Sequence, residues 1–142
     1  MAFVVKGREI AKQYAQQCAI FAGVDFSESS IRQVDLDLKR MAKDHEKNPI
    51  EIEDRNELSR QYGSYVGEVY RRHHGGVWGA EESLSKETAL GIQKGNQTFW
   101  PWYMCSKILK GGDGTIAWYY GYILMGLLHF KSSLNEIGNK VH

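Results

Sequence analysis

The chain has 142 residues, a length typical of one domain with a sizeable hydrophobic core. We therefore expect a single domain over residues 1–142, with residues 1–6 and 132–142 loosely ordered. Hydrophobic residues make up 42% and charged residues 25%, which is typical of a soluble globular protein. The formal net charge of +1 argues against a nucleic-acid partner, because electrostatic nucleic-acid binders carry a basic excess.

Three features bear on the compartment. Cys18 and Cys105 lie far apart in apolar surroundings, which predicts buried free thiols in a reducing compartment. Residues 1–13 lack the pattern of a signal peptide. The most apolar window, residues 116–130, has no Lys, Arg, Asp or Glu, but it is shorter than the roughly 20 residues of a membrane span. We expect a cytoplasmic protein with no membrane span.

Apolar residues at helical spacing predict three helices in the first half of the chain. The first runs from about Gly7 to Ala22, and the second ends at about His45. The third begins between Ile52 and Asn56 and ends at Gly75, where two glycines supply the positive φ angles that stop helices. The short connection between the second and third helices predicts an antiparallel pair.

The second half begins with strand patterns. Residues 77–79, 88–92 and 97–100 predict a three-stranded antiparallel meander, with a tight turn at Gly95–Asn96. A short helix from Pro101 to Leu109 follows, and a last, uncharged helix runs from 116 to about 131. Asp113 or Thr115 caps that helix. We therefore predict an α+β fold, in which helices are followed by a small three-stranded antiparallel meander and two further helices.

Gly63 and Gly67 lie one turn apart in the third helix. Each glycine costs a helix interior about 1 kcal/mol relative to Ala, which indicates a bare stripe that another element approaches closely. We place the last helix there, and we expect Gly63→Leu and Gly67→Leu to destabilise the protein by roughly 1–3 kcal/mol.

The densest polar cluster is Arg71-Arg72-His73-His74. Cations at a helix C-terminus interact favourably with its free carbonyls, and the arginines could instead grip an anion or a partner. Adjacent histidines point about 100° apart and chelate metal poorly, so we predict neither metal nor cofactor.

Glu68 permits two interpretations. It can form an ion pair with Arg72, or it can act as a general base in a pocket with Tyr65 and Trp78. The pocket candidates are therefore Tyr65, Glu68 and Arg72. We find no second titratable group with a defined role, and we predict no catalytic residue.

The tryptophans Trp78, Trp100 and Trp102 gather where the sheet meets the short helix. They form either core or an exposed interface, because Trp and Arg dominate binding hot spots. If the tryptophans form an exposed interface, charged residues would surround them at its rim. The predicted partner-binding residues are then Trp78, Trp100, Trp102, Arg71, Arg72, Glu53 and Asp54. The aromatic cluster could equally be the seam of a homodimer.

Residues 63–78 follow the pattern G-x-Y-x-G-E-V-x-R-R-x-x-G-G-x-W. This resembles a motif of small bacterial domains of unassigned activity, in which a helix with two glycines and a glutamate leads through Gly-Gly and Trp into a hairpin. Some small cytoplasmic proteins of similar build are immunity partners that occlude the toxins of competing bacteria. The resemblance implies protein binding and assigns no catalytic residue.

From the sequence we expect a cytoplasmic protein-binding domain, most plausibly an immunity-type protein that neutralises a cognate bacterial toxin by occlusion. The alternatives are a small enzyme or ligand-binding domain with a pocket around Glu68 and Arg72, or a homo-oligomeric structural protein.

Overall fold

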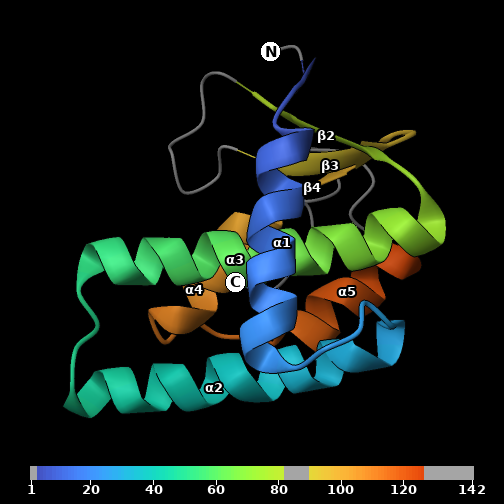
Figure 1. Cartoon of the computed structure of the whole chain (residues 1–142). Helices are drawn as coiled ribbons and strands as arrows, with labels where there is room; N and C mark the ends of the chain where they lie inside the picture. The colour runs from blue at the N-terminus through green and yellow to red at the C-terminus, as the bar shows by residue number, and fades with distance from the viewer. Residues whose placement is uncertain (1–2, 82–89, 127–142) are drawn as a thin grey trace.

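The computed structural model describes residues 3–81 and 90–126, which form an α+β fold (Figure 1). The helical elements are α1 (Arg8–Ala22), the short 3-10 helix η1 (Glu28–Ser30), α2 (Ile31–Lys47), α3 (Ile52–His74), α4 (Pro101–Leu109) and α5 (Ile116–Leu124). The strands are β1 (Val4–Val5), β2 (Val77–Ala80), β3 (Gly91–Lys94) and β4 (Gln97–Phe99). The helix boundaries agree with the apolar periodicity and glycine stops of the sequence. The last helix is shorter than predicted: α5 ends at Leu124 and Gly126 follows in a turn with a φ of 73°, while residues 127–131 of the predicted helix lie outside the described residues.

The strands form one antiparallel sheet in the order β1-β2-β3-β4. Its centre is hydrophobic, because Ile92 pairs with Trp78 on one side and with Phe99 on the other. The predicted turn at Gly95–Asn96 joins β3 to β4, which confirms the hairpin. The predicted turn over residues 82–86 and the strand start at residue 88 lie outside the described residues.

The prediction of a three-stranded sheet is corrected by β1. Val4 pairs with Ala80 and Val5 with Gly79, so a segment that we expected to be loosely ordered adds a fourth strand at the edge of the sheet. Two residues are too few for a periodic signal, and only the proximity of β2 makes this strand recognisable.

Helix α3 is the centre of the packing. It contacts α1 on one side and α4 on the other, and in Figure 1 α1 crosses it steeply while α4 and α5 lie behind. Helix α2 packs on α4 and α5. As predicted, α2 and α3 run antiparallel and are joined by the short connection of residues 48–51 (Figure 1), and Tyr62 of α3 donates to Asp37 of α2 at 3.1 Å. The two helices do not pack mainly on each other, however, because α4 packs against both of them.

The glycines of α3 mark two close contacts. A Cβ on Gly63 would lie 2.7 Å from the Cα of Trp102, and a Cβ on Gly67 would lie 2.3 Å from Cη2 of Trp78. The bare stripe thus receives the start of α4 and an indole ring. The last helix, which we had placed there, lies against α2 instead.

The start of α5 is held by two oxygen atoms. Thr115 Oγ1 accepts from the amide of Trp118 at 3.0 Å, which is the predicted cap. Asp35, buried on α2, accepts from the amide of Ile116 at 2.8 Å and thereby places a carboxylate at the positive end of the helix. This second contact fixes where α5 begins against α2.

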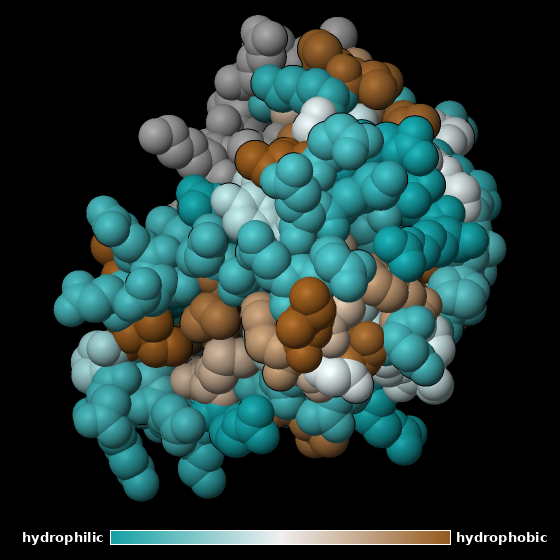
Figure 2. Space-filling view, in the orientation of Figure 1, coloured by the Kyte–Doolittle hydropathy of each residue, from teal (hydrophilic) through white to brown (hydrophobic). Residues whose placement is uncertain are grey.

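Hydrophilic residues cover most of the molecular face that carries α1, and hydrophobic residues show mainly in a band between α3 and α2 (Figure 2). Both cysteines are unpaired and buried, as predicted. Among the described residues, none of the helices has the length and apolar character needed to cross a membrane.

Candidate functional site

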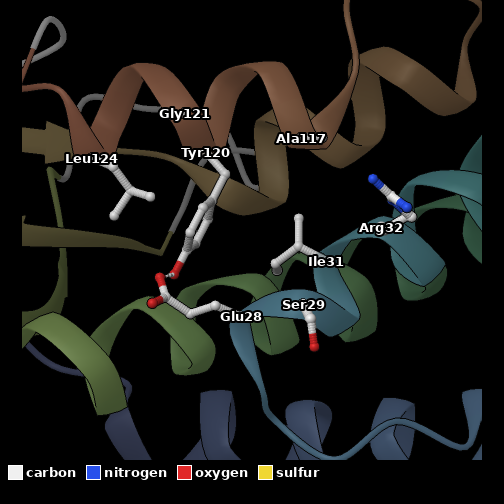
Figure 3. A pocket seen from close by; sticks show the side chains of 8 residues that line it. All are labelled: Glu28, Ser29, Ile31, Arg32, Ala117, Tyr120, Gly121 and Leu124. Atoms are coloured by element: carbon white, nitrogen blue, oxygen red, sulfur yellow. Dashed lines mark hydrogen bonds between the residues drawn. The ribbon is translucent and has the colours of Figure 1, made fainter.

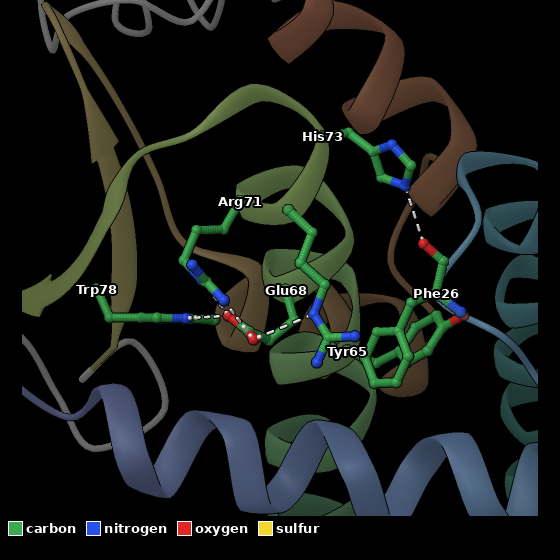
Figure 4. A network of polar contacts seen from close by, with 7 residues as sticks. Phe26, Tyr65, Glu68, Arg71, His73 and Trp78 are labelled. Atoms are coloured by element: carbon green, nitrogen blue, oxygen red, sulfur yellow. Dashed lines mark hydrogen bonds and ion pairs between the residues drawn. The ribbon is translucent and has the colours of Figure 1, made fainter.

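The Glu68 carboxylate is fully buried and every donor that faces it comes from the motif at residues 63–78. Arg71 donates from Nε at 2.6 Å and from Nη2 at 3.0 Å, and the indole of Trp78 donates at 2.9 Å (Figure 4). Arg72 Nε lies 3.5 Å from the second carboxylate oxygen. The ion pair predicted from the sequence is present, but Arg71 is its main cation and Arg72 the weaker one.

This geometry decides between the two interpretations of Glu68. Burial raises the pKa of Glu68, but the hydrogen bonds from Arg71 and Trp78, with the charges of Arg71 and Arg72, outweigh burial and leave the pKa below its usual value. A general base at neutral pH needs a raised pKa and an accessible oxygen. Glu68 has neither, so of the predicted pocket residues Tyr65, Glu68 and Arg72 this one anchors the β2 strand to α3 through Trp78.

The same end of α3 holds the loop before η1. Phe26 has a φ of 64°, unusual for a bulky residue, and three contacts hold it there. The Tyr65 hydroxyl accepts from its amide at 2.8 Å, His73 Nε2 lies 3.0 Å from its carbonyl oxygen, and the Arg72 guanidinium lies 3.7 Å from its ring centre. Arg72 is thus used in a cation–π contact that orders this loop.

The predicted aromatic patch is not a surface. Trp78 and Trp102 are only 2% and 5% exposed, and Trp102 donates from its indole nitrogen to Ser64 Oγ at 2.8 Å. Trp100 is half-buried and its ring packs near that of Phe3. The Trp78 ring fills the space at Gly67, so Trp78 and Trp102 belong to the core, whereas the half-buried Trp100 ring lies against Gly91.

The predicted charged rim does not form one surface either. Glu53 and Asp54 are exposed in the first turn of α3, where acidic side chains favour the helix dipole. Arg71 and Arg72 lie in the last turn, about 27 Å away at 1.5 Å per residue. The predicted partner-binding residues are therefore not brought together.

A cleft of about 510 Å³ lies elsewhere, between α5 and the start of α2 (Figure 3). One wall comes from η1 and α2, with the residues Glu28, Ser29, Ile31 and Arg32. The other wall comes from α5, with the residues Ala117, Tyr120, Gly121 and Leu124. Spacings of three, four and seven residues put the α5 wall on one helix face.

The inner end of this cleft is closed by a polar cluster of three residues. Glu28 Oε2 accepts from the Tyr120 hydroxyl at 2.6 Å and lies 2.8 Å from Nε2 of His74. The hydrogen bonds from Tyr120 and His74 lower the pKa of Glu28. Burial, followed by the bond to this carboxylate, raises the pKa of Tyr120. The cluster therefore holds an ionised Glu28 and a neutral Tyr120, and joins α5 to η1 and to the end of α3.

The outer face of α5 is exposed and uncharged. Trp118 and Leu124 are each 47% exposed and Met125, just after the helix, is 72% exposed. The rings of Trp118 and Tyr122 lie 4.2 Å apart, which extends the aromatic surface along the helix. Helix α5 contains no charged residue, so its exposed face and its cleft wall form one continuous apolar–aromatic surface.

Arg32 is the charged side chain on the other wall that remains available to a ligand. It is exposed, and no carboxylate of the described residues pairs with it. Glu28, by contrast, is occupied by Tyr120 and His74.

This surface does not follow from the sequence. Glu28 and Tyr120 are 92 positions apart, and no local pattern links them. The available signal was the uncharged circumference of the last helix, which fits a fully buried helix and an interface helix equally well. Comparisons with protein-family models, with curated proteins and with solved structures gave no match to this chain.

Proposed function

We propose that this chain is a protein-binding domain and that its partner docks on the outer face of α5. The observation that carries the proposal is the exposure of Trp118, Leu124 and Met125 on an element without charged residues. Aromatic and long apolar side chains of this kind dominate binding hot spots, and a contiguous exposed group of them marks interaction sites.

The exposed apolar residues of α1 form a weaker candidate surface. Ile20 and Phe21 are exposed on α1, but Gln16 and Gln17 are exposed one turn before them. The Phe21 ring also packs edge-on against Tyr62, with centroids 5.5 Å apart. The apolar site on α1 is small and is interrupted by the amide side chains of Gln16 and Gln17, whereas the apolar surface of α5 is continuous.

The immunity-type form of this proposal is that the domain neutralises a cognate bacterial toxin by occlusion in the cytoplasm. Its support is the motif resemblance at residues 63–78 and the unpaired thiols of Cys18 and Cys105, which fit a reducing compartment. In this form the motif is structural, since Glu68 and Trp78 anchor the sheet and α5 meets the toxin. Co-expression with the product of an adjacent gene tests it: the chain should rescue growth from that product, and Trp118→Ala should abolish the rescue.

The general proposal is tested by affinity capture from the native cytoplasm, followed by reconstitution from purified components. We expect one stoichiometric protein partner, whose binding falls at least tenfold in Trp118→Ala and in Met125→Ser. Ile20→Ala, a truncation at an apolar site as exposed as Met125, is the matched control and should bind like the wild type.

Three results would contradict the proposal. Loss of the partner in Ile20→Ala alone would move the interface to α1. A homodimer that dissociates in Trp118→Ala, measured by light scattering, would favour a homo-oligomeric structural protein. A complex unaffected by either α5 variant would remove α5 from the interface.

A further inference from the structure

The geometry of the cleft beside α5 indicates which kind of segment of the partner binds there. This inference rests on the proposed function above. We propose that this cleft binds an amphipathic helix of the partner, whose apolar side chains lie over Gly121 and Leu124 and whose carboxylate pairs with Arg32.

The cleft has open space at Gly121. A Cβ built on this glycine meets no atom within 4 Å, whereas a Cβ on Gly63 or Gly67 would lie within 3 Å of a neighbour. Ala117, one turn earlier on the same face, is also small and exposed. The face of α5 that forms the cleft wall therefore carries almost no side chain at these two positions, so an apolar side chain from a ligand can contact the helix backbone there.

The charges along the cleft favour an acidic ligand. The floor includes the buried Ile31, and Glu28 is already satisfied by two partners, so the cleft offers no free acceptor on that side. The Ser29 hydroxyl lies 3.1 Å from that of Ser27. Arg32 is left as the charged donor, and a guanidinium prefers a carboxylate because it can donate two parallel hydrogen bonds. A basic or fully apolar ligand would leave the Arg32 guanidinium without a carboxylate partner.

The shape of the cleft fits a helical ligand. Figure 3 shows Leu124 and Arg32 at opposite ends of the cleft, with Ile31 between them. Ala117 and Leu124 are two turns apart, about 10 Å, so the α5 wall of the cleft is about two turns of a helix long. A groove between two helices with this spacing fits the helix-in-groove mode of peptide recognition.

The test selects helical peptides of about four turns from a display library against the full chain. We expect the enriched sequences to carry Asp or Glu one to two turns from a pair of large apolar residues. Their affinity, measured by fluorescence polarisation, should fall about tenfold or more in Arg32→Glu. Replacing the peptide's acidic residue by Lys should restore affinity for that variant.

Two further variants make the result specific. Gly121→Leu should fill the cleft and abolish peptide binding while it leaves thermal unfolding unchanged or raises its midpoint, since no neighbour would be displaced. Lys39→Glu makes the same charge change at another exposed position of α2 and should bind like the wild type. Enrichment of peptides without an acidic residue, binding unaffected by Arg32→Glu or Gly121→Leu, or no enrichment at all would overturn the inference.

Failure of this inference is distinguishable from failure of the proposed function. A natural partner that is lost in Trp118→Ala but retained in Gly121→Leu and Arg32→Glu would keep α5 as the interface and exclude the cleft. A dimer of the chain itself that dissociates in Gly121→Leu would show that a second copy occupies the cleft, and would also overturn the inference.

Discussion

The hydroxyl of Tyr120 donates a 2.6 Å hydrogen bond to Glu28, and this contact joins α5 to η1, which directly follows the loop that α3 holds in place. His74, at the C-terminal end of α3, lies on the same carboxylate oxygen. The position of the proposed binding surface is thus linked to the motif at residues 63–78. The motif does not form the surface, but it supplies the residues that support it.

This link predicts a pH dependence of stability. The folded-state pKa of Glu28 is lowered, so its ionised form stabilises the fold above the usual pKa of about 4.3, and this contribution is lost as the pH falls through and below that value. Glu28→Gln should therefore lower the unfolding midpoint at pH 7, and its difference from the wild type should shrink on acidification. Thermal unfolding of both proteins across the acidic range measures this. A difference that is equal at all pH values would show that the charge of Glu28 is not involved.

The buried Glu68 should contribute far more than an exposed pair of the same spacing. Glu68→Gln removes the charge that Arg71 and Arg72 face, and we expect a loss of about 2 kcal/mol in unfolding free energy, because a buried pair loses one partner. Glu57→Gln breaks the exposed pair with Arg60, also three residues apart, and should change stability by less than about 0.5 kcal/mol. Denaturant unfolding gives both values. Equal effects would mean that burial adds nothing to the Glu68 pair.

The glycines of the helices should respond to alanine in opposite directions. A methyl group on Gly63 meets the backbone of Trp102, and one on Gly67 meets the Trp78 ring, so each change should destabilise by roughly 1–3 kcal/mol. The same change at Gly121 meets nothing and should stabilise α5 by about 0.5–1 kcal/mol. Unfolding midpoints of the three variants test the assignment. A neutral Gly63→Ala would show that α4 does not pack closely on α3.

Local patterns predicted the elements well, since helix periodicity and glycine stops depend on neighbours in sequence. The boundaries of α1 to α4 and the turn at Gly95–Asn96 follow from such signals. What a local pattern cannot specify is the partner of each face. The glycine stripe correctly indicated a close approach, yet the approaching groups are Trp78 and the start of α4, which the stripe alone cannot distinguish from any other element.

The candidate site was beyond sequence reasoning for the same reason. The sequence pattern allows Trp78 and Trp102 in either the core or an interface, because tryptophan occurs in both environments, and the fold places them in the core. The uncharged last helix was assigned to the core, yet Trp118 on its outer face is half exposed. The spacing of Glu68 to Arg71 and Arg72 allows either partner, and in the structure both arginines face the carboxylate, with Arg71 the closer.

Amide hydrogen exchange of the chain, alone and in complex with its purified partner, tests the central claim most directly. The account predicts that binding slows exchange of backbone amides in residues 116–125, with little change in the exposed part of α1 around Ile20. Protection confined to α1, or to the charged end of α3 at Arg71 and Arg72, with α5 exchanging as in the free chain, would contradict it.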